Sequence, residues 1–182
     1  IYVGGTYGNK AKALERFVRQ FGEVPLRIRN RLTLENDDKT FTARQTLELC
    51  ETVGVPMVLD LHHHMVNNEG EDAVGLWPRI ARTWDGAGTA DAEESIGLQV
   101  LPPKIHASSP KNDQDPRAHA DYVDPGPLLD FLRGVAGTGL TPWLDVMIEA
   151  KMKDGALFKL MEELPQHKGV ALLDQASIRI EG

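Results

Sequence analysis

Short apolar runs rich in β-branched residues alternate along this chain with longer stretches whose apolar residues recur at helical spacing. Alternation of strand and helix at this spacing is typical of βα units on a parallel sheet, so we expect an α/β protein. The pattern predicts strands at 1–3, 31–35, 57–61, 99–106, 144–149 and 170–173, and helices at 9–21, 42–53, 72–84, 127–135 and 154–164.

The composition is that of an ordinary soluble globular protein. Of 182 residues, 41% are hydrophobic and 26% charged, which excludes disordered and collagen-like chains. The single cysteine, Cys50, allows no internal disulfide, so we expect a protein that is not secreted: cytoplasmic in a bacterium, nuclear or mitochondrial in a eukaryote. No apolar run reaches the roughly 18 residues of a membrane span. The net charge of -7 excludes a globally basic nucleic-acid-binding surface, so DNA binding would need a local site.

The chain begins at Ile1 inside what reads as a strand, and it has no signal-peptide pattern, so we expect a fragment of a longer protein. Two of its connections are long. The segment 85–97 is rich in Gly, Ala and acidic residues and predicts a surface insertion. The segment 107–124 directly follows a strand and is the better candidate for a functional loop.

Side chains that can bind metal follow one predicted strand after another. Glu35, Asp60, His106 and Glu149 each lie at or near a strand end. In a (β/α)8 barrel the carboxyl ends of the strands converge on one face, which carries the active site. A single such residue is more often a cap or a solvated side chain, but the repetition over four strand ends favours a common metal site.

The candidate ligands offer oxygen and nitrogen but no thiolate, because Cys50 lies in the middle of a predicted helix. Such a set suits Mn²⁺, Zn²⁺, Fe²⁺ or Mg²⁺. Six candidates exceed the four ligands of one structural zinc ion, so we expect two or more ions, as in enzymes of phosphoryl displacement. The candidates are Glu35, Asp60, His63, His106, His119 and Glu149.

Three consecutive histidines, His62, His63 and His64, follow the strand predicted at 57–61. If the strand remains extended, alternation sends the middle residue to the face opposite its neighbours. With Asp60 three positions earlier, His63 is the expected ligand, and His62 and His64 are expected to pack or to support the site.

Five strings and their order closely resemble the UV damage endonuclease family. The strings are LTLENDDKTFT (32–42), VPMVLDLHHH (55–64), PPKIHASS (102–109), RAHADYV (117–123) and DVMIEAKMKD (145–154). The resemblance implies a TIM barrel similar to endonuclease IV and the xylose-isomerase-like proteins. It also implies a DNA repair enzyme that nicks the backbone 5′ of cyclobutane dimers and 6-4 photoproducts, with a cluster of two or three divalent ions, usually assigned as Mn²⁺.

The resemblance also implies roles for individual residues. It carries over the six metal ligands, with Glu35 and His106 as catalytic residues. Lys104 matches a lysine that is carboxylated in some members, and is expected to be catalytic as well. From their place on or near the same loops, Lys111 and Arg117 are expected to contact phosphates of damaged double-stranded DNA, with a solvated loop as the equal alternative. No membrane and no nucleotide cofactor are expected.

The chain departs from the family in two ways. Family members have a metal-ligating histidine before the double glycine, where this chain has Tyr2, and a phenol binds divalent ions far less readily than neutral imidazole. A complete barrel also takes about 250 residues. We therefore expect 1–182 to be the C-terminal portion, five to six βα units, of a single TIM-barrel endonuclease domain whose N-terminal part is missing.

Two other functions stay open at this level. A sugar isomerase or epimerase of the same barrel superfamily would use similar side chains, although LENDDK and the histidine triplet disfavour it. An inactive, truncated remnant of the endonuclease is favoured by Tyr2 and by the missing strands.

Overall fold

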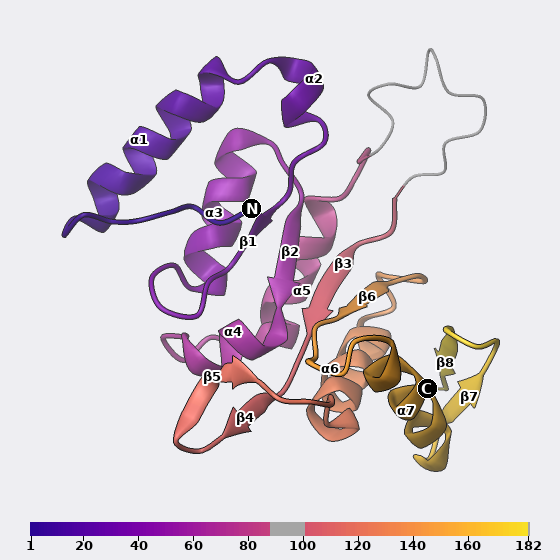
Figure 1. Ribbon diagram of the computed structural model, residues 1–182. Helices are drawn as coiled ribbons and strands as arrows, with labels where there is room; N and C mark the ends of the chain where they lie inside the picture. The colour runs from indigo at the N-terminus through magenta and orange to yellow at the C-terminus, as the bar shows by residue number, and fades with distance from the viewer. Residues whose placement is uncertain (88–100, 182) are drawn as a thin grey trace.

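The computed structural model describes residues 1–87 and 101–181, and its main sheet is parallel (Figure 1). Four strands lie in the order β1-β2-β3-β6, so neighbours in space follow one another along the chain. This arrangement confirms the expected α/β protein with a parallel sheet. The strands are β1 (Leu34–Glu35), β2 (Met57–Asp60), β3 (Lys104–Ala107) and β6 (Asp145–Ile148).

Helices connect these strands, and local capping side chains set their limits. At the start of α3, the Thr42 hydroxyl accepts from the Gln45 N–H while the Gln45 side chain accepts from the Thr42 N–H. The same helix ends at Gly54, whose φ of 70° lies in the left-handed region that favours glycine. The helices are α1 (Lys10–Glu23), α2 (Leu26–Arg29), α3 (Ala43–Val53), α4 (Leu61–Val66), α5 (Ala73–Arg82), α6 (Pro125–Thr138) and α7 (Asp154–Glu163), followed by the 3₁₀ helix η1 (Leu164–Gln166).

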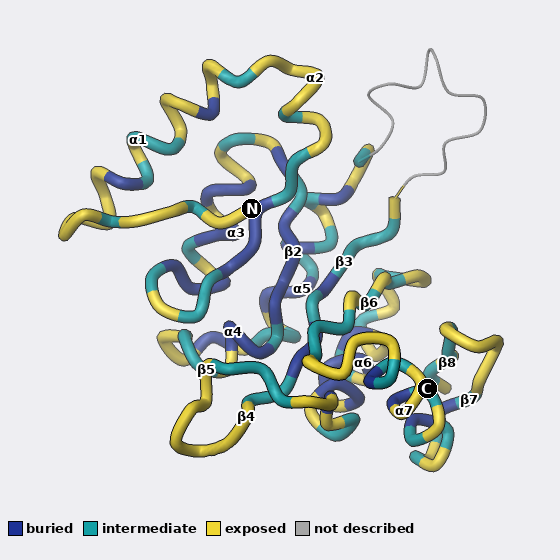
Figure 2. The backbone as a smooth tube through the Cα atoms, in the orientation of Figure 1, coloured by how far each residue is buried: buried dark blue, intermediate teal, exposed yellow. Residues whose placement is uncertain are grey.

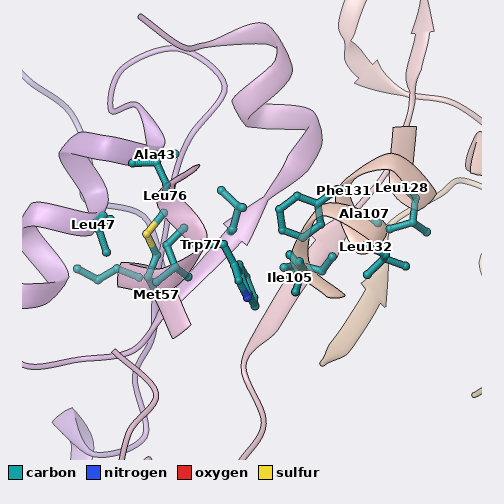
Figure 3. Close-up of a cluster of buried hydrophobic side chains, with 14 of the residues drawn as sticks. Ala43, Leu47, Met57, Leu76, Trp77, Ile105, Ala107, Leu128, Phe131 and Leu132 are labelled. Atoms are coloured by element: carbon teal, nitrogen blue, oxygen red, sulfur yellow. The ribbon is translucent and has the colours of Figure 1, made fainter. Parts of the chain in front are cut away.

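The core lies between the sheet and helices α3, α5 and α6 (Figure 3). Trp77 of α5 is fully buried and meets the Phe131 ring of α6 edge-on, with the ring centroids 5.5 Å apart. Figure 2 shows that buried residues run along β2 and parts of its flanking helices. Ile105 of β3 is fully buried in the same cluster. Lys104 and His106 alternate with the buried residues of β3 and therefore occupy the opposite face of the sheet.

The histidine triplet lies in α4, so the condition for the alternation argument, an extended strand through these residues, is not met. Asp60 ends β2 and also caps α4, because its side chain accepts from the His63 N–H at 2.7 Å. The chain thus turns into a helix directly after Asp60, and alternation between strand faces does not apply to His62, His63 and His64.

The predicted loop 107–124 contains a hairpin, β4 (Pro110–Asn112) with β5 (Asp115–His119), at the end of the sheet toward which β2 and β3 point (Figure 1). The last predicted strand is present as β7 (Val170–Leu172). It pairs antiparallel with β8 (Ile178–Ile180) in a separate two-stranded sheet and does not join the parallel one.

Near the N-terminus, 1–3 form no regular strand, although the Ile1 carbonyl accepts from the Glu35 N–H at 3.0 Å. The short helix α2 was not predicted. Most of the predicted insertion at 85–97, and residues 99–100 of the strand predicted at 99–106, lie outside the described residues. Residues 101–103 form no strand, so β3 begins later than predicted. No helix in the described part of the chain has the length and apolar character needed to cross a membrane.

Candidate metal centre

Neighbouring strands bring polar side chains to one edge of the sheet. Glu35 ends β1, Asp60 ends β2, His106 lies in β3 directly opposite Asp60, and Glu149 follows β6. Because the carboxyl ends of parallel strands meet at the same edge, residues far apart in the sequence come together here. Glu35, Asp60 and His106 each offer one ligand atom, and these three atoms lie within 4.8 Å of one another.

Asp60 is fully buried, and its two carboxylate oxygens have different surroundings. Oδ1 accepts from the His63 N–H, whereas Oδ2 has no hydrogen-bond partner among the described residues. Burial, together with the carboxylates of Glu35 and Glu149, raises the pKa of Asp60 although His63 works against the rise. A buried carboxylate with an unpaired oxygen is costly, and a bound cation would remove that cost, so the residues present fit a divalent ion.

His106 lies between two carboxylates. Its Nδ1 is 3.0 Å from Glu35 Oε1 and 3.2 Å from Glu149 Oε1. Burial works against the charged form of both Glu35 and His106, but their mutual hydrogen bond and attraction prevail, so the pKa of Glu35 is lowered and the pKa of His106 is raised. Without metal, Glu35 and His106 therefore share a proton. A metal ion that bound to the same oxygen and nitrogen atoms would compete with that proton.

His63 and Asn36 complete the inner part of the site. His63 Nδ1 lies 3.7 Å from Glu35 Oε1 and 3.6 Å from Asp60 Oδ2, and it is hydrogen-bonded to the Asn36 carbonyl at 3.0 Å. The sequence interpretation missed Asn36. Its position in LENDDK, directly after the strand that ends in Glu35, could have indicated this role, because a side-chain amide at a strand end can bond to a neighbouring strand.

Tyr2, the residue that departs from the family pattern, lies at this site. Its hydroxyl donates to Glu35 Oε1 at 3.3 Å, and its ring centroid is 5.9 Å from that of His63. Partial burial of Tyr2, which is 49% exposed, and the nearby carboxylates raise its pKa, so the hydroxyl keeps its proton at neutral pH.

His119 lies beside the cluster and outside the close group of three ligand atoms. Its ring centroid is 6.3 Å from that of His63 and 5.3 Å from that of His62. His62 holds the hairpin in place: its Nδ1 is 2.9 Å from Ser108 Oγ and its Nε2 is 2.6 Å from the Pro116 carbonyl. The roles of His63, His119 and Glu149 as ligands remain predictions.

The three basic residues singled out in the sequence lie in different surroundings. Lys104 is half-buried on the same face of β3 as His106. Lys111, exposed on the hairpin, has its Nζ 3.8 Å from Asp115 Oδ2. Arg117 donates from Nε to the Asp38 carbonyl at 3.0 Å. The distances given for Lys111 and Arg117 are to Asp115 and Asp38, and not to the ligand atoms of Glu35, Asp60 and His106.

Comparison with known proteins finds a matching family, related sequences and a related structure. The family model described as UV-endonuclease UvdE matches residues 1–181. The UV DNA damage endonuclease of Bacillus pumilus (strain SAFR-032) is 43% identical over 170 residues, which is 93% of this chain and 49% of the relative. That of Bacillus velezensis (strain DSM 23117 / BGSC 10A6 / LMG 26770 / FZB42) is 44% identical over 177 residues, 95% of this chain and 50% of the relative. The chain thus spans about half the length of these relatives. The crystal structure of SacUVDE matches with a TM-score of 0.73 at 27% identity, over 91% of this chain and 50% of that chain. The chain belongs to the UV-endonuclease UvdE family.

Proposed function

We propose that the protein containing this chain is a divalent-metal-dependent endonuclease that nicks damaged double-stranded DNA 5′ of cyclobutane dimers and 6-4 photoproducts in excision repair. The observation that carries the proposal is the meeting of Glu35, Asp60 and His106 around the unpaired Oδ2 of Asp60. The family and the names of the Bacillus relatives support the substrate. The bacterial origin of these relatives also supports a cytoplasmic location, because bacterial DNA lies in the cytoplasm.

We further propose that residues 1–182 form one part of a single (β/α)8 barrel of the endonuclease IV and xylose isomerase type. The sequential order β1-β2-β3-β6 supports this, because neighbouring strands of a barrel follow one another along the chain, whereas the order of a doubly wound sheet reverses. This chain covers only 50% of the SacUVDE chain that it resembles, which supports its being one part of a larger fold.

Glu35, Asp60 and His106 would hold a first ion, and we propose His63, His119 and Glu149 as further ligands of a cluster of two or three. Carboxylate and imidazole ligands suit several divalent ions, and the family resemblance favours Mn²⁺ among them. A bound divalent ion acts as a Lewis acid on a phosphodiester and lowers the pKa of a coordinated water. Carboxylation of Lys104, which shares a face of β3 with His106, would add a carboxylate to that face.

Residues of the chain would hold a proton at the site and orient one of the proposed ligands. His106 Nδ1 can hold a proton between the carboxylates of Glu35 and Glu149 and release it when the charge at those carboxylates is neutralised. The Tyr2 hydroxyl keeps its proton, so it orients Glu35 as a donor and does not act as a base. The half-buried positions of His106 and Glu149 leave the edge of the cluster open to a phosphodiester.

Contacts with DNA are proposed for Lys111 and Arg117 on the hairpin beside the site. Both side chains lie near carboxylates, Lys111 near Asp115 and Arg117 near Asp38. Exposed ion pairs of this kind are worth little, so a phosphate can replace the carboxylate at small cost.

The test is nicking of UV-irradiated DNA by the intact protein with Mn²⁺. We expect Glu35→Gln and His106→Ala to lower lesion-dependent nicking by at least about 100-fold, since ligands and charge stabilisation at the phosphodiester are lost. Glu162→Gln, at an exposed position of α7, is the control and should leave nicking unchanged. Undiminished nicking in both site variants refutes the proposal, and a wild-type protein with substoichiometric metal and no nicking supports an inactive remnant instead.

A further inference from the structure

Asn36 connects the ends of two strands through its side chain, which is fully buried. Its Nδ2 donates to the Asp60 carbonyl at 3.0 Å, and the Asp60 N–H donates to its Oδ1 at 2.9 Å. This pair of bonds joins the two chain segments just beyond the point where the main-chain pairing of β1 with β2 ends, at Glu35 opposite Val58. The amide therefore fixes the backbone of Asp60 relative to the end of β1.

The main-chain carbonyl of Asn36 makes a second connection, to His63 Nδ1 at 3.0 Å. A carbonyl oxygen can only accept a hydrogen bond, so Nδ1 carries the proton in this contact. In neutral imidazole the lone pair then lies on Nε2, which is the form that can bind an ion through Nε2. The tautomer of His63 thus depends on where the Asn36 carbonyl is held.

Asp60 is hydrogen-bonded to both Asn36 and His63 and so connects the three residues. Its Oδ1 accepts from the His63 N–H at 2.7 Å, which fixes the carboxylate and the start of α4 together. Its Oδ2 has no partner among the residues that the structure describes. The hydrogen bonds among Asn36, Asp60 and His63 therefore leave one carboxylate oxygen and one imidazole nitrogen for a ligand.

We propose that Asn36 is a positioning residue, which sets the orientation of Asp60 and the tautomer of His63 before any ion binds. The proposal rests on the proposed function for the identity of the ligand, a divalent cation. The orientation and the tautomer are properties of the metal-free chain and can be measured without it.

A matched control lies at the other end of the same strand. Thr83 Oγ1 accepts from the Met57 N–H at 2.9 Å, so it also bonds to the backbone of β2 through its side chain. Met57 begins β2 and Asp60 ends it. Thr83→Val removes one side-chain bond to β2 without touching the site, whereas Asn36→Ala and Asn36→Leu remove the two bonds at the site.

The experiment combines two measurements on the intact chain. Long-range ¹H–¹⁵N NMR of the metal-free protein reports the tautomer of His63, and calorimetry with Mn²⁺ reports affinity. We expect a proton on Nδ1 in the wild type and in Thr83→Val, and a mixture of tautomers in both Asn36 variants. We expect Mn²⁺ binding about 10- to 100-fold weaker in the Asn36 variants, as for other residues that orient ligands, and unchanged binding in Thr83→Val.

A proton on Nε2 of His63 in the metal-free wild type overturns the inference, even if the Asn36 variants fail to fold. An equal loss of Mn²⁺ affinity in Thr83→Val and Asn36→Ala also overturns it, since a general weakening of β2 would then explain both. If the wild type binds no Mn²⁺, the proposed function fails, while the tautomer comparison still decides the role of Asn36.

Discussion

Helices α5 and α6 pack closely where Gly134 of α6 faces Val74 of α5. A Cβ atom added at Gly134 would lie 2.6 Å from Val74 Cγ2 and 3.0 Å from Val74 Cγ1, closer than packed carbon atoms tolerate. Valine in a helix has one strongly preferred χ1 rotamer, so its side chain cannot turn away without cost. Gly134→Ala is therefore expected to push the helices apart or to strain Val74.

The expected change in stability follows from two opposing contributions. Overpacking costs about 1–3 kcal/mol, and replacing glycine by alanine inside a helix contributes about 1 kcal/mol of stability. The net destabilisation is about 1 kcal/mol, which lowers the melting temperature of a chain of this size by about 3 °C. Gly137 is the control in the same helix, because a Cβ there meets nothing within 4 Å. Gly137→Ala should raise stability by up to about 1 kcal/mol.

The assay is thermal and urea unfolding of the purified chain, followed by circular dichroism, in a double-mutant cycle with Val74→Ala. Because the smaller side chain makes room for the new methyl group, we expect a favourable coupling energy of about 1–2 kcal/mol between Gly134→Ala and Val74→Ala. A coupling energy near zero, or equal effects of Gly134→Ala and Gly137→Ala, would show that close packing against Val74 does not limit residue 134.

Three further predictions concern the candidate metal centre. Because burial and neighbouring carboxylates raise the pKa of Asp60, its ionisation destabilises the metal-free fold above that pKa and ceases to do so as the pH falls through it. In urea unfolding with EDTA, Asp60→Asn should therefore be more stable than the wild type at pH 7.5. It should lose that advantage by pH 4, and an advantage that does not change with pH contradicts the argument. Mn²⁺ at 100 times its Kd should stabilise the wild type by about 2.7 kcal/mol in the same assay and should not stabilise Glu35→Gln with His106→Ala; equal stabilisation of both places the ion elsewhere. Tyr2→His puts an imidazole next to Glu35 and should tighten Mn²⁺ binding in calorimetry, with Tyr7→His, at an exposed tyrosine, as the control; a gain in both would rule out a site effect.

Local patterns in the sequence were sufficient for the main strands and for most helices. The helix at Ala43–Val53 has a capping box at its start and a glycine at its end, and both signals act within a few residues, so the sequence predicts this helix with nearly correct limits. The same holds for β2, which is buried throughout, and for β6, which is half-buried on one face. The strand β3 is buried on one face but begins at Lys104, five residues after the predicted start. The prediction of one parallel sheet followed from their alternation with helices.

Contacts with other segments of the chain decided the parts that the sequence pattern did not predict. The strand at Val170–Leu172 has the expected apolar run, but it pairs with Ile178–Ile180 because a nearby antiparallel partner is available in the chain. The hairpin at Pro110–His119 carries few apolar residues, so its pattern does not distinguish it from a loop. It is held from outside, by the bonds of His62 to Ser108 and Pro116.

The sequence alone determined that Glu35, Asp60, His106 and Glu149 lie near strand ends and that the ligands are oxygen and nitrogen, because strand periodicity and side-chain chemistry are local properties. Only the tertiary structure decided which of these atoms meet within 4.8 Å, that Tyr2 joins them, and that Asn36 ties Asp60 to His63. Such contacts depend on strand register and on the direction in which the chain turns after each strand. Both are settled by packing between residues that are far apart in the sequence.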